Sequence, residues 1–195
     1  MHTPSDYDLW TSFKKGDRNS LSVIYKRYYE SLYAYGISMG MKKETVKDAI
    51  QEVFLKLYFN TTFNVSDNNL KFYLLKSVRN QLLDMVKLKK DTEDVSKHGS
   101  SFTLDVTIED ELINNEEYLQ IKQLVNKALS QLTERQKEII YLRYVEEIEY
   151  AEIARLMNIK VQSVRNIVFK AMEKLKGLDP DDFIFFFTLL FLRPI

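Results

Sequence analysis

The sequence predicts an almost entirely α-helical protein built from two small domains. Glycine and proline are scarce, with 5 and 3 residues in a chain of 195, and apolar residues recur at three- and four-residue steps. Residues 1–95 carry 15 basic and 12 acidic side chains, 96–117 carry 1 and 6, and 118–177 carry 11 and 7. We therefore expect two mildly basic helical domains joined by an acidic, flexible linker.

The composition argues against several kinds of chemistry. The chain has no cysteine, which rules out disulfides and thiolate metal ligands and fits a reducing compartment. Its two histidines, His2 and His98, lie in polar segments, so we expect neither a metal centre nor a histidine-based catalytic pair. We find no glycine-rich phosphate-binding motif and no signal peptide. No cofactor, small-molecule substrate or enzymatic activity is expected.

Two helices are expected at the start of the first domain. Ser5 can cap a first helix that ends near Gly16, and Ser20 can cap a second helix that ends at Gly40. The second helix has one apolar stripe that should face the core. This stripe consists of Leu21, Ile24, Tyr25, Tyr28, Leu32, Tyr35 and Met39.

A third helix over 43–59 has its apolar residues on one face, whereas Leu55 falls outside that face. The turn-forming segment 60–69 follows, and a fourth helix is expected from about 70 to 89. Leu55 has no place in the core of its own domain, so we interpret it as a contact for a partner. A solvated face with one stray leucine is the plain alternative.

The second domain should begin with a long helix that ends near Ser130, and a helix capped by Thr133 should follow and end near Val145. Residues 149–176, EYAEIARLMNIKVQSVRNIVFKAMEKLK, then have helix-turn-helix spacing. Asn158 takes the turn position that glycine usually occupies, because asparagine tolerates the left-handed backbone needed there.

The second helix of this motif, over 161–176, has the side chains of a helix that reads DNA. Polar donors gather at its start and basic residues follow, which suits insertion into the major groove. The candidate DNA contacts are Lys160, Gln162, Ser163, Arg165, Asn166 and Lys170. For this segment alone, a plain helical hairpin with a solvated polar face is the alternative.

The whole of 133–176 resembles the C-terminal domain of extracytoplasmic-function (ECF) sigma factors, which direct bacterial RNA polymerase to promoters. DAIQEVFLKLY at 48–58 is similar to the helix by which these factors bind the polymerase clamp. KFYLLKSVRNQLLDMVKLKK at 71–90 resembles their promoter-melting helix, with Tyr73 where the family has tryptophan. Two domain patterns in the family's order are far more specific than either pattern alone.

The resemblance implies a role for each part of the chain. It implies that residues 1–92 bind core polymerase and recognise the −10 element, that 93–117 form the linker, and that 118–177 recognise the −35 element. The implied polymerase contacts are Asp48, Gln51, Glu52 and Leu55. The implied −10 contacts are Asn64, Ser66, Asn68, Tyr73, Lys76, Arg79, Asn80 and Lys87.

The resemblance also implies partners, namely core RNA polymerase, promoter DNA and an anti-sigma factor, for a non-enzymatic cytoplasmic protein that is a monomer when free. Two other functions remain open. One is a stand-alone helix-turn-helix regulator that binds DNA without polymerase, and the other is a sigma-like decoy that binds protein but not DNA. A promoter-binding assay with and without core polymerase separates the three.

The tail 178–195 lies outside the family pattern and is the most apolar stretch of the chain. Asp179 and Pro180 suit the start of a short hydrophobic helix, which over 180–192 would be about 20 Å long and too short to span a membrane. It is expected either to plug an apolar surface and weaken polymerase binding or to complete the C-terminal core. Truncation after Gly177 separates the two, because loss of a plug strengthens polymerase binding whereas loss of core causes precipitation.

Overall fold

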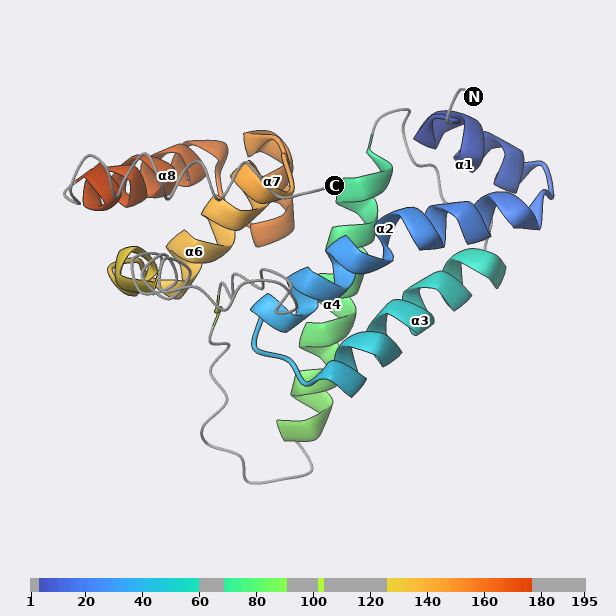
Figure 1. The fold of residues 1–195 in the computed structure, drawn as a ribbon, viewed down its shortest axis with the longest axis horizontal. Helices are drawn as coiled ribbons and strands as arrows, with labels where there is room; N and C mark the ends of the chain where they lie inside the picture. Colours follow the sequence, from blue (N-terminus) through green and yellow to red (C-terminus); the bar gives the residue numbers. More distant parts are fainter. Residues whose placement is uncertain (1–3, 60–68, 91–101, 104–125, 177–195) are drawn as a thin grey trace, which may run out of the picture. The chain divides into compact units, whose positions relative to one another are not determined.

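The computed structural model describes residues 4–59, 69–90, 102–103 and 126–176. Every regular element in these ranges is helical, which confirms the predicted all-α class (Figure 1). The chain forms two compact units, residues 1–99 and 100–195, each with its own buried apolar core.

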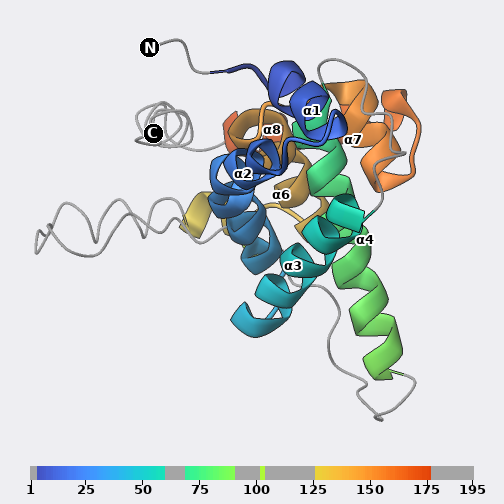
Figure 2. The ribbon, with the colours of Figure 1, turned by 90° about the vertical axis from the view of Figure 1, so that its right-hand side faces the viewer.

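The first unit is built around α2 (Arg18–Ser38), which packs against α1 (Asp6–Lys14), α3 (Lys43–Phe59) and α4 (Leu70–Lys90). Figure 1 shows α4 crossing the neighbouring pair α2 and α3, and Figure 2 shows α1 beside α2. The largest fully buried side chains of this unit are Ile24, Leu32, Tyr35, Ile50, Leu57, Leu74, Leu75 and Leu82. The exposed side chains of α3, among them Asp48, Gln51 and Leu55, lie on the face of the helix opposite this core.

The predicted cap of α1 is confirmed, but the predicted cap of α2 is wrong. Ser5 Oγ accepts a hydrogen bond from the Asp8 N–H at 3.1 Å, and the Asp8 carboxylate accepts one from the Ser5 N–H at 3.2 Å. The two bonds make a capping box. At α2 the cap is Asp17, which accepts from the Asn19 N–H at 3.0 Å. Ser20 lies inside the first turn, buried, and donates to Asp17 Oδ2 at 2.7 Å. Asp17 therefore starts the helix three residues earlier than expected.

Tyr25 departs from the predicted buried stripe of α2. It is 38% exposed, and its ring packs against Tyr29 at 5.3 Å and edge-on against Phe54 at 5.0 Å between centroids. A tyrosine at the edge of the stripe covers the seam between two helices while its hydroxyl end reaches solvent. The other predicted residues of the stripe are buried.

The second unit contains a helical segment at 126–130, α6 (Glu134–Ile140), the π-helical turn η1 (Tyr141–Val145), α7 (Tyr150–Met157) and α8 (Val161–Lys176). Both α6 and α7 pack against α8. Thr133 and Gln136 form the predicted capping box at the start of α6.

The helix expected over 133–145 ends at Val145, as predicted, but its last turn, over 141–145, is π-helical. The N–H of Glu146 donates to the Tyr141 carbonyl at 3.0 Å, five residues back. The buried Glu146 side chain accepts from the Tyr141 hydroxyl at 2.9 Å. We attribute the wider turn to this buried pair, which needs both side chains on the same side of the chain.

Phe102, from the predicted linker, is part of the second unit. It is 3% exposed, and its ring packs edge-on against Tyr141 at 5.8 Å between centroids. Outside the described residues lie the other parts of the predicted linker, 93–101 and 104–117, together with the segment 60–68 and the predicted tail helix.

Candidate functional site

Asn158 sets the turn of the helix-turn-helix motif. Its backbone is left-handed, with φ 52° and ψ 51°, as predicted from its tolerance of that conformation. The N–H of Ile159 donates to the Ala154 carbonyl at 3.0 Å. Ala154 is itself buried and small, which allows α7 and α8 to pack closely. The predicted motif is confirmed.

The outward face of α8 carries most of the predicted DNA contacts. Its members follow at three- and four-residue steps, which places them on one side of the helix. Ser163 is half-buried at the edge of this face. Gln162 Nε2 donates to Asn166 Oδ1 at 3.1 Å, which holds two polar side chains together at the start of the helix. The exposed members of the predicted set are Lys160, Gln162, Arg165, Asn166 and Lys170.

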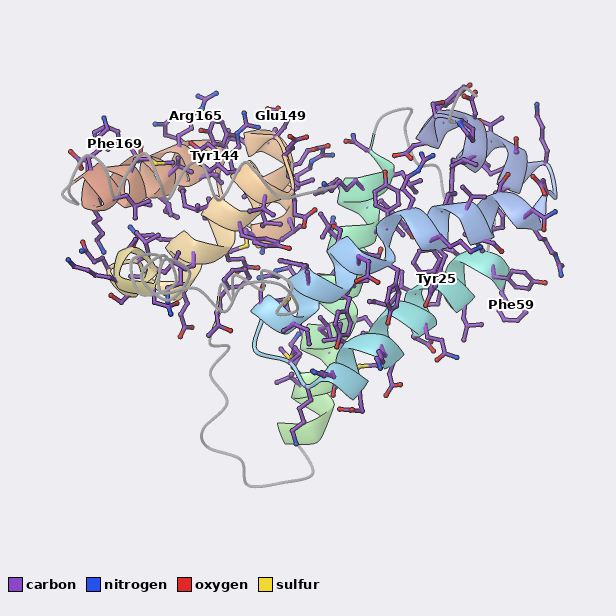
Figure 3. All side chains as sticks on the ribbon, in the orientation of Figure 1. Tyr25, Phe59, Tyr144, Glu149, Arg165 and Phe169 are labelled. Atoms are coloured by element: carbon purple, nitrogen blue, oxygen red, sulfur yellow. The ribbon has the colours of Figure 1, made fainter. Side chains whose placement is uncertain are left out.

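Phe169 lies on the same face and was missed by the sequence analysis. It is 63% exposed and follows Arg165 by four residues and Asn166 by three (Figure 3). Its spacing from Asn166 and Arg165 was visible in the sequence and could have identified it. An apolar side chain on a helix that enters the major groove can contact the methyl group of thymine.

Lys174 contributes to the fold of the second unit. Its Nζ donates to the Gln131 carbonyl at 3.0 Å and to Gln136 Oε1 at 3.2 Å, across from α8 to the start of α6. Lys170, Lys174 and Lys176 are all exposed, and of these Lys174 also bonds to residues at the start of α6.

Arg143 is likewise held within the second unit. It donates to Glu149 Oε1 at 3.1 Å, and its guanidinium lies 4.9 Å from the centre of the Tyr150 ring. Burial lowers the pKa of Arg143, but the hydrogen bond and charge of Glu149 outweigh burial and leave it raised. Burial, together with Tyr150, raises the pKa of Tyr144. This cluster braces the segment that leads into α7.

The four predicted polymerase contacts lie on the face of α3 that points away from the core. Asp48, Gln51 and Leu55 are exposed, and Leu55 is 42% exposed, as its position off the apolar stripe predicted. Glu52 is half-buried, and its carboxylate lies 3.6 Å from Lys56 Nζ. The structure thus brings together two carboxylates, an amide and an apolar side chain.

The predicted −10 contacts on α4 fall into two sets. Tyr73, Lys76, Asn80 and Lys87 follow at three-, four- and seven-residue steps and share one face. Arg79 falls outside that repeat and is half-buried. The other predicted −10 contacts, Asn64, Ser66 and Asn68, lie outside the described residues.

The side chains on the α4 face differ in their surroundings. Burial raises the pKa of Tyr73. The Nζ of Lys76 lies 5.9 Å from the centre of the Phe72 ring. Lys87 is exposed and lies 3.5 Å from Asp84 Oδ1. Basic groups therefore occur along the whole face, although a carboxylate offsets the charge near its end.

Two kinds of feature are absent from the described part of the chain. Residues 4–59, 69–90, 102–103 and 126–176 contain no group of three His, Cys, Asp or Glu side chains that could hold a metal ion. Within the same ranges, no helix combines the length and the apolar character needed to cross a membrane.

Two protein-family models match the chain, and together they cover more than half of it. The model described as Sigma-70 region 2 matches residues 24–92. The model described as Sigma-70, region 4 matches residues 122–175. The first therefore falls on the unit that contains α3 and α4, and the second on the unit that contains the helix-turn-helix.

Curated relatives match over most of their length. The ECF RNA polymerase sigma factor SigM of Bacillus subtilis is 26% identical over 168 residues, covering 82% of this chain and 94% of the relative. The ECF RNA polymerase sigma-E factor of Escherichia coli is 25% identical over 182 residues, covering 87% and 91%.

Two solved structures share the fold. CnrH, in complex with the cytosolic domain of CnrY, has a TM-score of 0.55 and 16% identity, covering 88% of this chain and 95% of its own. The sigma factor RpoE of Bartonella quintana, in complex with the anti-sigma factor NepR, has a TM-score of 0.57 and 21% identity, covering 80% and 94%.

Proposed function

The chain belongs to the extracytoplasmic-function (ECF) sigma factors, and from that premise we propose how its two units divide promoter recognition. Proteins of this family are non-enzymatic initiation factors that bring core RNA polymerase to promoter DNA. One observation carries the proposal. The region 2 and region 4 matches fall on separate compact units, and each unit presents an exposed polar helix face.

The outward face of α3 binds core polymerase. Asp48, Gln51 and Glu52 supply acceptors for basic and polar side chains of the enzyme, and Leu55 supplies an apolar contact. These groups lose their water when the interface forms, so binding is favourable only where the partner offers a matching donor for each acceptor. The exposure of Leu55 supports this role, because the helix already has a complete apolar face toward its own core.

The face of α4 and the segment before it bind the −10 element. Melted DNA needs stacking surfaces and donors for phosphates and base edges. Tyr73 and Asn80 can contact bases, and Lys76, Arg79 and Lys87 can contact the backbone. Asn64, Ser66 and Asn68 provide short polar groups for base edges.

The outward face of α8 reads the −35 element. Arg165, Gln162 and Asn166 are placed to contact base edges, with Lys160 and Ser163 at the start of the helix and Lys170 toward phosphate. Phe169 adds an apolar contact that fits a thymine methyl group. The unit spanning α6 to α8 acts as the rigid support of this helix.

The two other functions are not favoured. A stand-alone regulator has no use for a region 2 unit, and a decoy without DNA binding has no use for the polar face of α8. The matches to both sigma regions support promoter recognition with polymerase.

Regulation of the free protein is a further part of the proposal. The similar RpoE structure contains an anti-sigma factor. We propose that an anti-sigma factor also holds this chain away from core polymerase until it is released. The free chain would be a cytoplasmic monomer. The tail 178–195 is the other candidate regulator. Truncation after Gly177 tests it, because a regulatory tail predicts stronger polymerase binding by the shortened chain.

The polymerase interface is tested by combining Asp48→Arg, Gln51→Ala and Leu55→Ala in one variant. We expect loss of co-purification with core polymerase, since these residues are exposed and their replacement leaves the core of the unit intact. Far-ultraviolet circular dichroism should remain unchanged. Retained co-purification would place the polymerase interface elsewhere on the protein.

A further inference from the structure

Phe59 is the most exposed of the large apolar side chains in the described part of the chain. It is 80% exposed at the last residue of α3, four residues after Leu55, which is 42% exposed. A four-residue step places both side chains on the same side of the helix. Asp48 and Glu52 belong to the same outward side, so Phe59 continues the surface proposed above to bind polymerase.

The end of α3 that carries Phe59 is held in place by neighbouring aromatic groups. The ring of Phe59 packs edge-on against Tyr58 at 5.2 Å between centroids. The guanidinium of Arg18, at the start of α2, lies 4.4 Å from the centre of the Tyr58 ring. A helix end that is tied to its neighbour presents its last side chain in a defined position. Figure 3 labels Phe59 at this end of α3.

The groups around Phe59 favour a protein partner over nucleic acid. Asp48 and Glu52 are carboxylates on the same side of α3, and they would repel DNA phosphates. The nearby cations are already engaged within the unit. Arg18 lies against the Tyr58 ring, and Lys56, one turn before Phe59, lies 3.6 Å from the Glu52 carboxylate and donates to Gln81 Oε1 at 2.8 Å. Glu52 and Asp48 lie about two and three turns before Phe59 on the same side of α3, and a helix face that ends in an exposed aromatic ring after such carboxylates is complementary to an apolar socket with basic side chains along one edge.

We propose that Phe59 is the apolar anchor of the polymerase-binding face, inserting into a socket on core RNA polymerase that basic side chains border. The inference rests on the proposed function and deepens it by assigning the apolar end of the interface. Asp48, Gln51 and Glu52 supply polar selectivity along α3, and Leu55 and Phe59 exclude water at its end. Aromatic side chains that fill a partner's pocket account for a large share of binding energy in protein interfaces.

The test is a titration of the full-length, fluorescently labelled chain with purified core RNA polymerase. Phe59→Ala should weaken binding about 10- to 100-fold, as truncation of an interface anchor does. Phe59→Leu should recover part of the affinity. Val23→Ala is the matched control, because Val23 is 41% exposed on α2 and lies outside this face, and it should bind as the unchanged protein does.

Asp48→Arg, measured in parallel, tests the polymerase-binding face of α3 separately from the Phe59 anchor. If Asp48→Arg abolishes binding while Phe59→Ala binds normally, the anchor is excluded and the polymerase face stands. If neither change weakens binding, the face and its anchor are both wrong. Normal polymerase binding by Phe59→Ala with impaired promoter opening would assign Phe59 to DNA and overturn the inference. Unchanged circular dichroism of each variant excludes unfolding as the cause.

Discussion

Asn158 is a residue whose side chain matters less than its backbone conformation. Its φ of 52° lies in the left-handed region, which most side chains adopt only at a cost. The position was predictable because it falls between two helical patterns at the spacing of a helix-turn-helix. Glu147, with φ 57°, also has a left-handed backbone, but it was not predictable, because glutamate has no such preference and the conformation follows from the π-helical turn before it.

Substitution of Asn158 should reveal this requirement. Asn158→Val should destabilise the second unit by about 1–2 kcal/mol, because a β-branched residue resists the left-handed region. Asn158→Gly is the matched control and should be neutral or slightly stabilising. Hydrogen exchange of the α7 and α8 amides, followed by mass spectrometry in the full-length protein, measures the difference. Equal exchange in both variants would mean that the turn relaxes to another conformation.

At the scale of helices, α2 and α3 approach closely at Gly36. A Cβ atom built on Gly36 would lie 2.6 Å from Val46 Cγ1 and 2.9 Å from Cγ2. Val46 is fully buried, so its branched side chain has little room to move. The glycine therefore fixes how near the helix that carries the polymerase face lies to α2.

Gly36→Ala should lower the free energy of unfolding of the first unit by about 1–3 kcal/mol, because overpacking outweighs the gain in helix propensity. Adding Val46→Ala should relieve the clash, so the two changes should not be additive. Urea unfolding followed by the fluorescence of Trp10 reports on this unit, because Trp10 is the one tryptophan of the chain and is buried in α1. Strict additivity would show that the helices separate freely at this point.

We expect different side chains of the α8 face to contact bases and phosphates, with Arg165 at a base edge and Lys170 at the DNA backbone. Arg165→Ala should cost about 1–3 kcal/mol of promoter binding by the polymerase complex and relax specificity at one −35 position. Lys170→Ala should weaken all sequences alike and reduce the slope of binding against salt by about one. Binding to a set of single-base promoter variants at several salt concentrations measures both. The same sequence-independent loss in both variants would contradict the division.

Helix positions were predictable wherever a local signal was strong. The boundaries of α3 and α8 agree with those predicted from the sequence. The capping box at Thr133 identified the first residue of α6 correctly. Asp17 and Ser20 are both good caps three residues apart, and local preference alone did not choose between them. The π-helical turn coincides with a buried hydrogen bond between Tyr141 and Glu146, five residues apart, a spacing that the 3.6-residue period of an α-helix does not predict.

The surfaces were less predictable than the helices. Periodicity identified Leu55 as off the core face, and the same argument applied one turn later would have identified Phe59. Phe169 was hidden among apolar residues of α8 that do face the core. For both phenylalanines helical spacing offered a signal, and the structure adds how far each side chain is exposed, 80% for Phe59 and 63% for Phe169.

At the scale of the whole molecule, the two units are each compact and are joined through a stretch in which Phe102 belongs to the second unit. Composition assigned Phe102 to an acidic linker, because a single aromatic residue in a polar segment gives no periodic signal. Its ring packs against that of Tyr141, 39 residues later in the chain, and a contact so far apart in sequence leaves no local pattern. The linker boundaries therefore remain a prediction, and Phe102 is a described residue within them that packs in the second unit.

We propose that the chain selects promoters only together with core RNA polymerase. This claim is tested most directly by selecting from a pool of random-sequence DNA duplexes with the chain alone, with core polymerase alone, and with both. We expect the combination to enrich duplexes that share two spaced motifs, and neither component to enrich them by itself. Enrichment by the chain alone would identify a stand-alone regulator, and no enrichment by the combination would identify a decoy, so either result would contradict the claim.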